Sequence, residues 1–141
     1  MTETGISEEF ADQLASTCRT AVGDSLRSVV YFTPDAFDLI YLRSDLYEGD
    51  HERAREAKQT LVENERLGFD SAETYNKTAK AGFEPDIGEY EFTIRVFSKG
   101  FVNRVIVGDH GVLLTTNELR ITEFEELAVA LRKQLADHEP T

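Results

Sequence analysis

The stretch from Glu89 to Thr116, EYEFTIRVFSKGFVNRVIVGDHGVLLTT, constrains the fold more than any other part of the chain. It predicts three antiparallel strands joined by two tight turns. Apolar residues at positions 90, 92, 94 and 96 alternate with mainly polar ones, which is the period of a half-buried strand. Lys99-Gly100 fits the centre of the first turn, with Gly100 supplying a positive φ, and Asp109-His110 fits the centre of the second.

These two turns predict the register of the meander. The expected pairs are Ser98–Phe101, Val96–Asn103, Ile94–Val105, Phe92–Val107, Val107–Val112 and Val105–Leu114. One face then collects nearly every apolar residue, whereas a slip of one residue would place Ile94 opposite Arg104 and scatter the pattern. Because both turns select the same core face, the meander is internally consistent.

The other face of the meander is less polar than a solvated face should be. It carries Phe97, Val102, Ile106 and Leu113 beside Thr93, Arg95, Arg104 and Thr115. A helix of the same chain, a dimer interface or a ligand floor could cover such a patch, and we favour the helix because the chain has helices to spare.

The predicted register also places Arg95 directly opposite Arg104. Like charges in that position need a neutralising partner. We expect Glu91, or a carboxylate of the long acidic helix such as Glu56 or Glu63, to provide it. A bound anion is the alternative.

Helical patterns flank the meander. We predict a first helix from Ser7 to Gly23, a long polar helix that Asp50 caps and Gly68 ends, and a short one after Ser71. Thr122 and Glu125 form a T-x-x-E capping box for a last, core-packing helix. The remaining predicted elements are the strands Leu26–Thr33 and Phe37–Arg43, joined at Pro34-Asp35, and a loop over Gly82–Gly88 that contains Pro85.

This order, α-β-β-α-β-β-β-α, predicts an α+β fold. We expect the last strand to lie beside the first, which gives a single five-stranded antiparallel sheet with helices on both faces. At 141 residues the chain is long enough for one domain spanning 1–141, with flexible tails at 1–5 and 138–141.

The element order resembles the roadblock and profilin-like folds, which place two helices on one sheet face and the middle helix on the other. The stretches SVVYFTPDAFDLIYLR, ENERLGF and YEFTIRVF are also similar to small uncharacterised proteins of haloarchaea. The first resemblance implies a topology, and the second implies a salty cytoplasm; neither implies an activity.

The net charge of -12 restricts the possible partners. Binding to nucleic acid or to anionic membranes depends on basic residues, so neither is expected. Only 5 lysines accompany 10 arginines, and a dispersed acidic surface of this kind suits concentrated salt. The acidic N-terminus MTETGISEEF is unlike a signal peptide, which predicts a cytoplasmic protein without membrane insertion.

Motifs for chemistry are weak. Phosphate-loop, dinucleotide-binding and nucleophile-elbow motifs are missing, and His51, His110 and His138 lack the short spacing of metal ligands. The single Cys18 excludes an internal disulfide and is expected in the core. We therefore expect no cofactor and no metal.

Two functions follow from these patterns. The first is a non-catalytic interaction or regulatory module that acts as a homodimer through the long helix and the sheet, or that binds another protein. The second is a site for an anionic metabolite, binding or catalytic, near Arg95, Arg104, Tyr31 and Tyr41. Asp109 and His110 are further loop candidates, since functional groups often lie in such loops, although both are also common turn residues.

Overall fold

The computed structural model describes residues 2–81 and 88–138, with side chains described for all of these except residues 76–81. The helices are α1 (Glu8–Val22), α2 (His51–Glu65), α3 (Leu67–Ala81) and α4 (Ile121–Asp137), with short 3-10 turns at Gly23–Ser25 and Leu46–Gly49. The strands are β1 (Leu26–Phe32), β2 (Phe37–Leu42), β3 (Thr93–Phe97), β4 (Gly100–Val107) and β5 (His110–Thr116).

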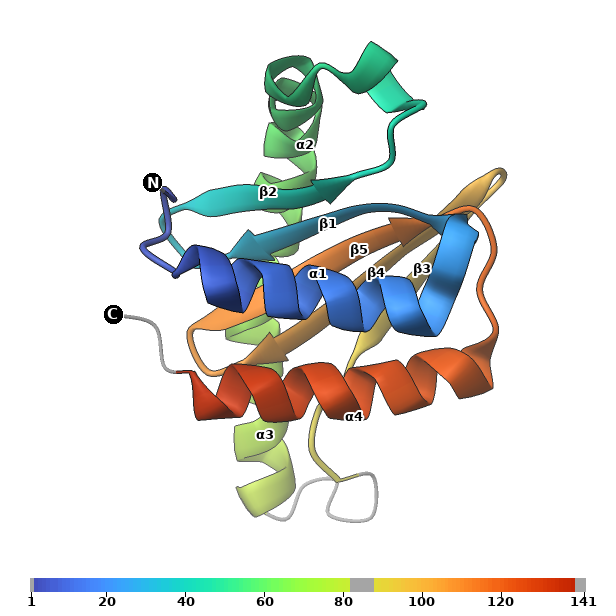
Figure 1. Ribbon diagram of the computed structural model, residues 1–141. Coiled ribbons are helices and arrows are strands. Elements are labelled where there is room, and N and C mark those ends of the chain that lie inside the picture. The colour runs from blue at the N-terminus through green and yellow to red at the C-terminus, as the bar shows by residue number, and fades with distance from the viewer. Residues whose placement is uncertain (1, 82–87, 139–141) are drawn as a thin grey trace.

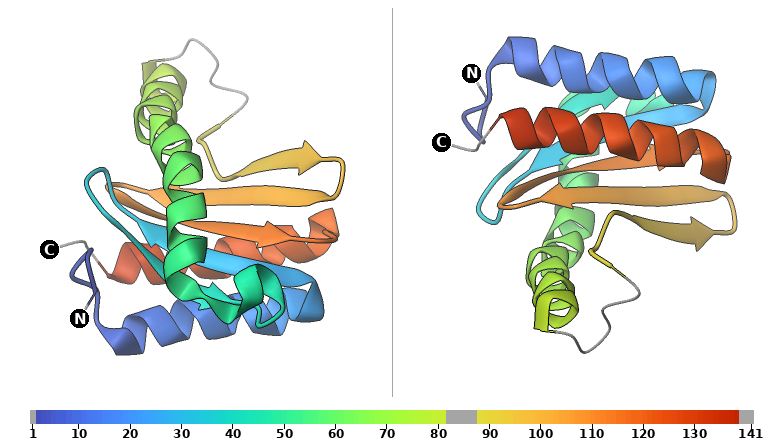
Figure 2. Two further views of the ribbon diagram at one scale, coloured as in Figure 1. Left: turned by 90° about the horizontal axis from the view of Figure 1, so that it is seen from above. Right: turned by 90° about the horizontal axis from the view of Figure 1, so that it is seen from below.

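The five strands form one antiparallel sheet in the order β2-β1-β5-β4-β3, so the last strand lies beside the first, as predicted. Helices α1 and α4 run side by side across one face of the sheet, and α2 and α3 cross the other face (Figures 1 and 2). The predicted α+β fold with helices on both faces is confirmed.

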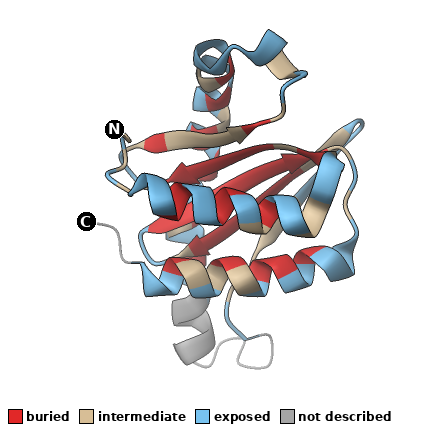
Figure 3. Ribbon diagram, viewed as in Figure 1, coloured by how far each residue is buried: buried red, intermediate tan, exposed pale blue. Residues whose placement is uncertain are grey.

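Two hydrophobic cores fill the two spaces between sheet and helices. The strands hold many of the buried residues (Figure 3). The first core joins α1 and α4 to the sheet, and its largest buried members include Leu14, Tyr31, Leu114, Phe124 and Leu131. The second core joins α2 and α3 to the sheet through Val30, Phe32, Phe37, Val62, Ala72, Ile106 and Leu113. A helix of the same chain therefore covers much of the second face, as predicted.

The observed register differs from the predicted one by two residues at both turns. Ile94 pairs with Asn103, and Val105 pairs with Val112, so the turns are Ser98-Lys99 and Gly108-Asp109. A shift of two residues keeps every side chain on its predicted face. The two core faces were therefore predicted correctly although the pairs were wrong.

The reason for the shift lies in what the glycines do. Gly108 has φ 60° and supplies the turn conformation, whereas Gly100 does not have a positive φ. Instead, a Cβ on Gly100 would lie 2.6 Å from the backbone oxygen of Thr116. Gly100 is therefore a strand residue that allows two backbones to approach closely, and the turn precedes it.

Three helix boundaries also differ from the prediction. Helix α2 ends at Glu65, and Gly68 lies inside α3 instead of ending a helix. Helix α4 begins at Ile121 after Arg120, without a side-chain cap, so Thr122 does not form the predicted capping box.

None of the helices in the described part of the chain combines the length and the apolarity that a membrane span requires.

The N-terminal segment contacts β2 in this structure. The backbone nitrogens of Glu3 and Thr4 donate to the Asp38 carboxylate at 2.8 and 2.9 Å. At the other end, the ring of His138 stacks on Phe10 with centroids 4.0 Å apart. The flexibility predicted for both tails stays a prediction, and the loop predicted around Pro85 lies outside the described residues, as do residues 139–141.

Candidate functional site

The junction between α2 and α3 contains a buried carboxylate that binds two arginines. The Glu65 side chain is only 1% exposed. Its Oε1 accepts a hydrogen bond from Arg104 Nη1 and its Oε2 accepts one from Arg95 Nε, both at 2.8 Å. The Arg104 side chain is 7% exposed and that of Arg95 is 44% exposed, so the pair with Arg104 is the one shielded from water.

Arg104 uses its remaining donors within the same cluster. Its Nη2 donates to Thr93 Oγ1 at 3.0 Å, and its Nε donates to the Tyr90 hydroxyl at 3.3 Å. A Cβ on Gly68 would lie 2.4 Å from the Arg104 guanidinium carbon, so the backbone of α3 packs directly on this group. These contacts form the Glu65 cluster (Glu65, Gly68, Tyr90, Thr93, Arg95 and Arg104), which fastens the helix junction to β3 and β4.

The Glu65 cluster corrects one prediction and confirms another. Arg95 pairs with Val102 and not with Arg104, so the predicted opposition of the two arginines is wrong. The predicted neutralisation by a carboxylate of the long helix is confirmed, although the residue is Glu65 and not Glu56 or Glu63. Glu91, the other expected partner, instead pairs with Arg132 of α4, and its Oε1 lies 3.5 Å from Arg132 Nη1.

Tyr31 and Tyr41 lie on the opposite side of the sheet from the Glu65 cluster. Tyr31 is buried in the first core, and Tyr41 packs against that core with the Arg19 guanidinium 5.3 Å from its ring centre. Arg95 and Arg104 face α2 and α3 instead. The structure therefore does not bring these four predicted ligand residues together, because the sheet separates the tyrosines from the arginines.

His110 is a core residue and not a turn residue. It is the first residue of β5, and its side chain is buried beneath α4. Its Nδ1 lies 2.6 Å from the Tyr31 hydroxyl and its Nε2 lies 2.7 Å from the Leu135 carbonyl oxygen. Both ring nitrogens therefore hold the first core together, whereas Asp109 stays exposed in the turn.

Burial raises the pKa of Tyr31 to about 12, with the nearby charge of Asp38 as the second cause. A tyrosine whose pKa is raised in the folded state is neutral there at a pH where the unfolded chain has already lost the proton. The stability that Tyr31 provides is thus complete below pH 10, its ordinary value, and is lost as the pH rises toward 12. Burial also raises the pKa of Cys18 to about 12, which makes this thiol unreactive at neutral pH.

Replacing Tyr31 with Phe should lower the free energy of unfolding by about 1–3 kcal/mol at neutral pH, because His110 Nδ1 would lose its partner. The alkaline loss of stability above pH 10 should become smaller in the same variant. Urea denaturation at several pH values measures both effects. Tyr75→Phe, at an exposed tyrosine of α3, is the matched control, and equal alkaline slopes in wild type and Tyr31→Phe would contradict the assignment.

The outer edge of the sheet is a strand with exposed apolar side chains. Within the described residues, β3 pairs with β4 alone. Val96 is 73% exposed and Phe97 is 56% exposed, on opposite faces of this strand. Helix α3 projects past the same edge and carries the exposed Leu67 and Tyr75 (Figure 2). We call Val96, Phe97 and the β3 backbone the edge surface.

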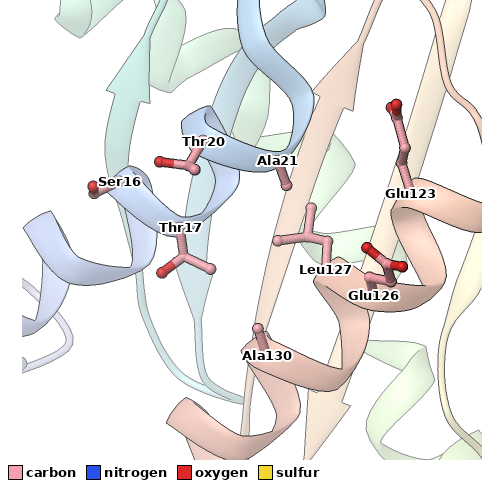
Figure 4. Close-up of a pocket in the computed structure, with 8 residues that line it drawn as sticks. All are labelled: Ser16, Thr17, Thr20, Ala21, Glu123, Glu126, Leu127 and Ala130. Atoms are coloured by element: carbon pink, nitrogen blue, oxygen red, sulfur yellow. The ribbon is translucent and has the colours of Figure 1, made fainter.

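A shallow groove separates α1 from α4 on the other side of the molecule (Figure 4). Its volume is about 570 Å³, and its lining residues are Ser16, Thr17, Thr20, Ala21, Glu123, Glu126, Leu127 and Ala130. Gln134 Nε2 donates to Thr17 Oγ1 at 2.8 Å and links the two helices nearby.

In the described part of the chain, no three His, Cys, Asp or Glu side chains are grouped in a way that could hold a metal ion.

This arrangement, with two helices on one face of a five-stranded antiparallel sheet and the middle helices on the other, defines a roadblock-like α+β domain. The structure of Myxococcus xanthus MglB, a roadblock-fold protein, is similar to it with a TM-score of 0.52 and 15% sequence identity, covering 94% of this chain and 93% of that chain. The likeness confirms the predicted roadblock-like topology.

The family of the chain is shown by its sequence. Residues 12–136 match the family described as "Domain of unknown function (DUF7522)", so the chain belongs to this family. No curated protein matches the chain. The similarity to haloarchaeal proteins stays a prediction.

Proposed function

We propose that this domain is a non-catalytic protein-interaction module with a regulatory role, and that it acts as a homodimer through the edge surface. The observation that carries the proposal is the unpaired edge of β3 with Val96 and Phe97 exposed. An uncovered edge strand presents backbone donors and acceptors that a further strand can pair with. Natural proteins protect such edges unless they use them.

A second copy of the chain fits this edge well. Two β3 strands can pair antiparallel about a two-fold axis, which places the same patch of each copy in a self-complementary contact. The projecting helix α3 of each copy would add apolar contact beside the strands. Each copy carries a charge of -12, so repulsion between copies should make the dimer stronger at high salt, where that repulsion is screened.

The net charge also supports a protein as the partner instead of nucleic acid or an anionic membrane. The same charge supports a salt-rich cytoplasmic setting. The Glu65 cluster supports a regulatory role without catalysis. Its buried Arg104, a predicted ligand-binding residue, already forms hydrogen bonds within the protein.

Replacing Val96 with Lys should weaken the dimer at least about 100-fold, because a charge at the edge of a strand opposes pairing and removes an apolar contact. Sedimentation equilibrium over a range of protein and salt concentrations measures the dissociation constant. Val129→Lys is the matched control, since Val129 is similarly exposed but lies on α4. A wild-type chain that stays monomeric at high salt and high protein concentration would overturn the proposal.

A further inference from the structure

A second groove lies where α3 and α4 approach the turn between β4 and β5. Its volume is about 810 Å³, within the range of about 300–1,000 Å³ that small-molecule sites occupy. Phe69, Tyr90 and Ile106 provide apolar and aromatic walls. We call it the α3–α4 groove; Figure 1 shows the elements that surround it.

Two arginines line this groove with donors that the described residues do not use. Arg66 donates from Nε to the Thr33 carbonyl oxygen at 3.0 Å, and its two other guanidinium nitrogens have no hydrogen-bond partner among the groups that the structure describes. Arg132 Nη1 lies 3.5 Å from Glu91 Oε1, and only its buried Nε has no acceptor in the described part of the chain. An anionic group in the groove would give the unused Arg66 donors an acceptor and would be stabilised there.

Four carboxylates line the same groove: Asp70, Glu73, Glu89 and Asp109. Asp70 on α3 and Asp109 in the β4–β5 turn are both exposed. Neither side chain forms a hydrogen bond or an ion pair with another described residue. Arg66, Asp70 and Asp109 therefore offer the groove positive and negative groups that do not neutralise one another by direct contact.

We propose that the α3–α4 groove binds a small zwitterion of the α-amino-acid type with an apolar side chain. Arg132 and Arg66 would hold the carboxylate, Asp109 and Asp70 would hold the ammonium group, and Phe69 would contact the side chain. A ligand with only a negative charge would be repelled by a protein of charge -12. A ligand with only a positive charge would leave the arginine donors without an acceptor. A zwitterion satisfies both signs.

This site goes beyond the proposed interaction module and does not depend on it. The groove lies at the β4–β5 turn, whereas Phe97 of the edge surface lies at the β3–β4 turn at the other end of β4. A chain that fails to dimerise could still bind a zwitterion, and the reverse also holds. The two proposals are therefore tested separately.

Isothermal titration calorimetry of the full chain with leucine, leucinamide and N-acetylleucine tests the proposal. Leucine should bind at least about tenfold more tightly than either analogue, because each analogue lacks one charged group and loses a charge-assisted hydrogen bond worth more than about 1.4 kcal/mol. Methionine and phenylalanine should bind in the same range as leucine.

Two substitutions assign the ends of the ligand. Arg132→Gln should weaken leucine at least about tenfold while leaving leucinamide unchanged, and Asp109→Asn should weaken leucine while leaving N-acetylleucine unchanged. Arg120→Gln is the matched control, because Arg120 is exposed and outside the groove. Arg132→Lys keeps the charge and guards against a variant that fails to fold, which circular dichroism would detect.

The proposal is overturned if none of the three amino acids gives heat or a thermal shift at about 10 mM, a concentration that would reveal millimolar binding. It is also overturned if leucinamide binds as tightly as leucine, which would indicate a cation site. Tight N-acetylleucine binding would likewise overturn it in favour of an anion site. Equal effects of Arg132→Gln and Arg120→Gln would place the ligand elsewhere.

Discussion

Replacing Glu65 with Gln is expected to lower the free energy of unfolding by about 3–5 kcal/mol, the usual cost of removing one partner from a buried ion pair. Gln has nearly the same shape as Glu but carries no charge. Arg104, with a side chain only 7% exposed, would then be a buried cation without a counter-charge. Arg95 is 44% exposed, so water can replace its lost partner and it adds little to the effect.

Chemical denaturation followed by circular dichroism measures this loss. Glu63→Gln is the matched control, because Glu63 is exposed two residues earlier on the same helix and its replacement should change stability by no more than about 0.5 kcal/mol. A Glu65→Gln variant as stable as Glu63→Gln would mean that the pair with Arg104 is not shielded from water. Stability would then have to come from the two cores alone.

A paired replacement separates the value of the ion pair from the cost of breaking it. Glu65→Leu combined with Arg104→Met should recover most of the stability that Glu65→Gln loses, because buried ion pairs are often no better than apolar residues of similar volume. Arg104→Met alone should be as harmful as Glu65→Gln, since it leaves the carboxylate buried without its main partner. If the double variant does not recover this stability, the ion pair stabilises the fold more than apolar side chains of similar volume do.

Which faces of the meander point inward could be predicted from the sequence, whereas the pairing could not. The period of two in residues 90–97 fixes which side chains share a face, and a register shift of two residues leaves that unchanged. Pairing depends on which residues form the turn. Gly100 and Gly108 look alike in the sequence, but one allows close approach to Thr116 and the other adopts a positive φ.

The Glu65 cluster was only partly predictable. A neutralising carboxylate was predicted from an opposition of Arg95 and Arg104 that the structure does not contain. Glu65 itself was not predicted, because a charged residue is not expected on a buried helix stripe. It follows Val62 by three residues and Leu61 by four, which is the spacing of one helix face. That spacing is the signal that could have identified it.

His110 was misplaced for a related reason. A histidine in a Gly-Asp-His-Gly stretch is typical of an exposed turn, and only the packing of α4 over β5 shows that its ring lies in the first core. The contacts that bury it come from Tyr31 and Leu135, at sequence separations of 79 and 25 residues. Local patterns contain no information about partners this distant.

The two proposed sites share one structural dependence on the helix junction. Arg95 lies in the edge strand and bonds to Glu65, while Arg66, the next residue after Glu65, lines the α3–α4 groove. The Glu65 cluster therefore holds elements of both sites. Damage at the junction should affect dimer formation and ligand binding together, whereas Val96→Lys and Arg132→Gln should affect only one each.

Replacing Gly68 with Ala is expected to destabilise the protein by about 2 kcal/mol or more, although the same change in an ordinary helix stabilises by about 1 kcal/mol. The new Cβ would lie 2.4 Å from the guanidinium carbon of Arg104. An arginine side chain could normally move aside. Here Glu65, Thr93 and Tyr90 hold it, so moving it breaks the buried ion pair.

The sign of this change distinguishes a packed junction from a loose one, and chemical denaturation measures it. Ser71→Ala on the exposed side of the same helix is the control and should stabilise by a few tenths of a kcal/mol. In the Glu65→Leu, Arg104→Met background the guanidinium is gone, so Gly68→Ala should become neutral or stabilising there. If Gly68→Ala stabilises the wild-type chain, the backbone of α3 at Gly68 does not pack tightly on the Arg104 guanidinium. The assignment of Glu65 as the residue that fixes the junction would then be wrong as well.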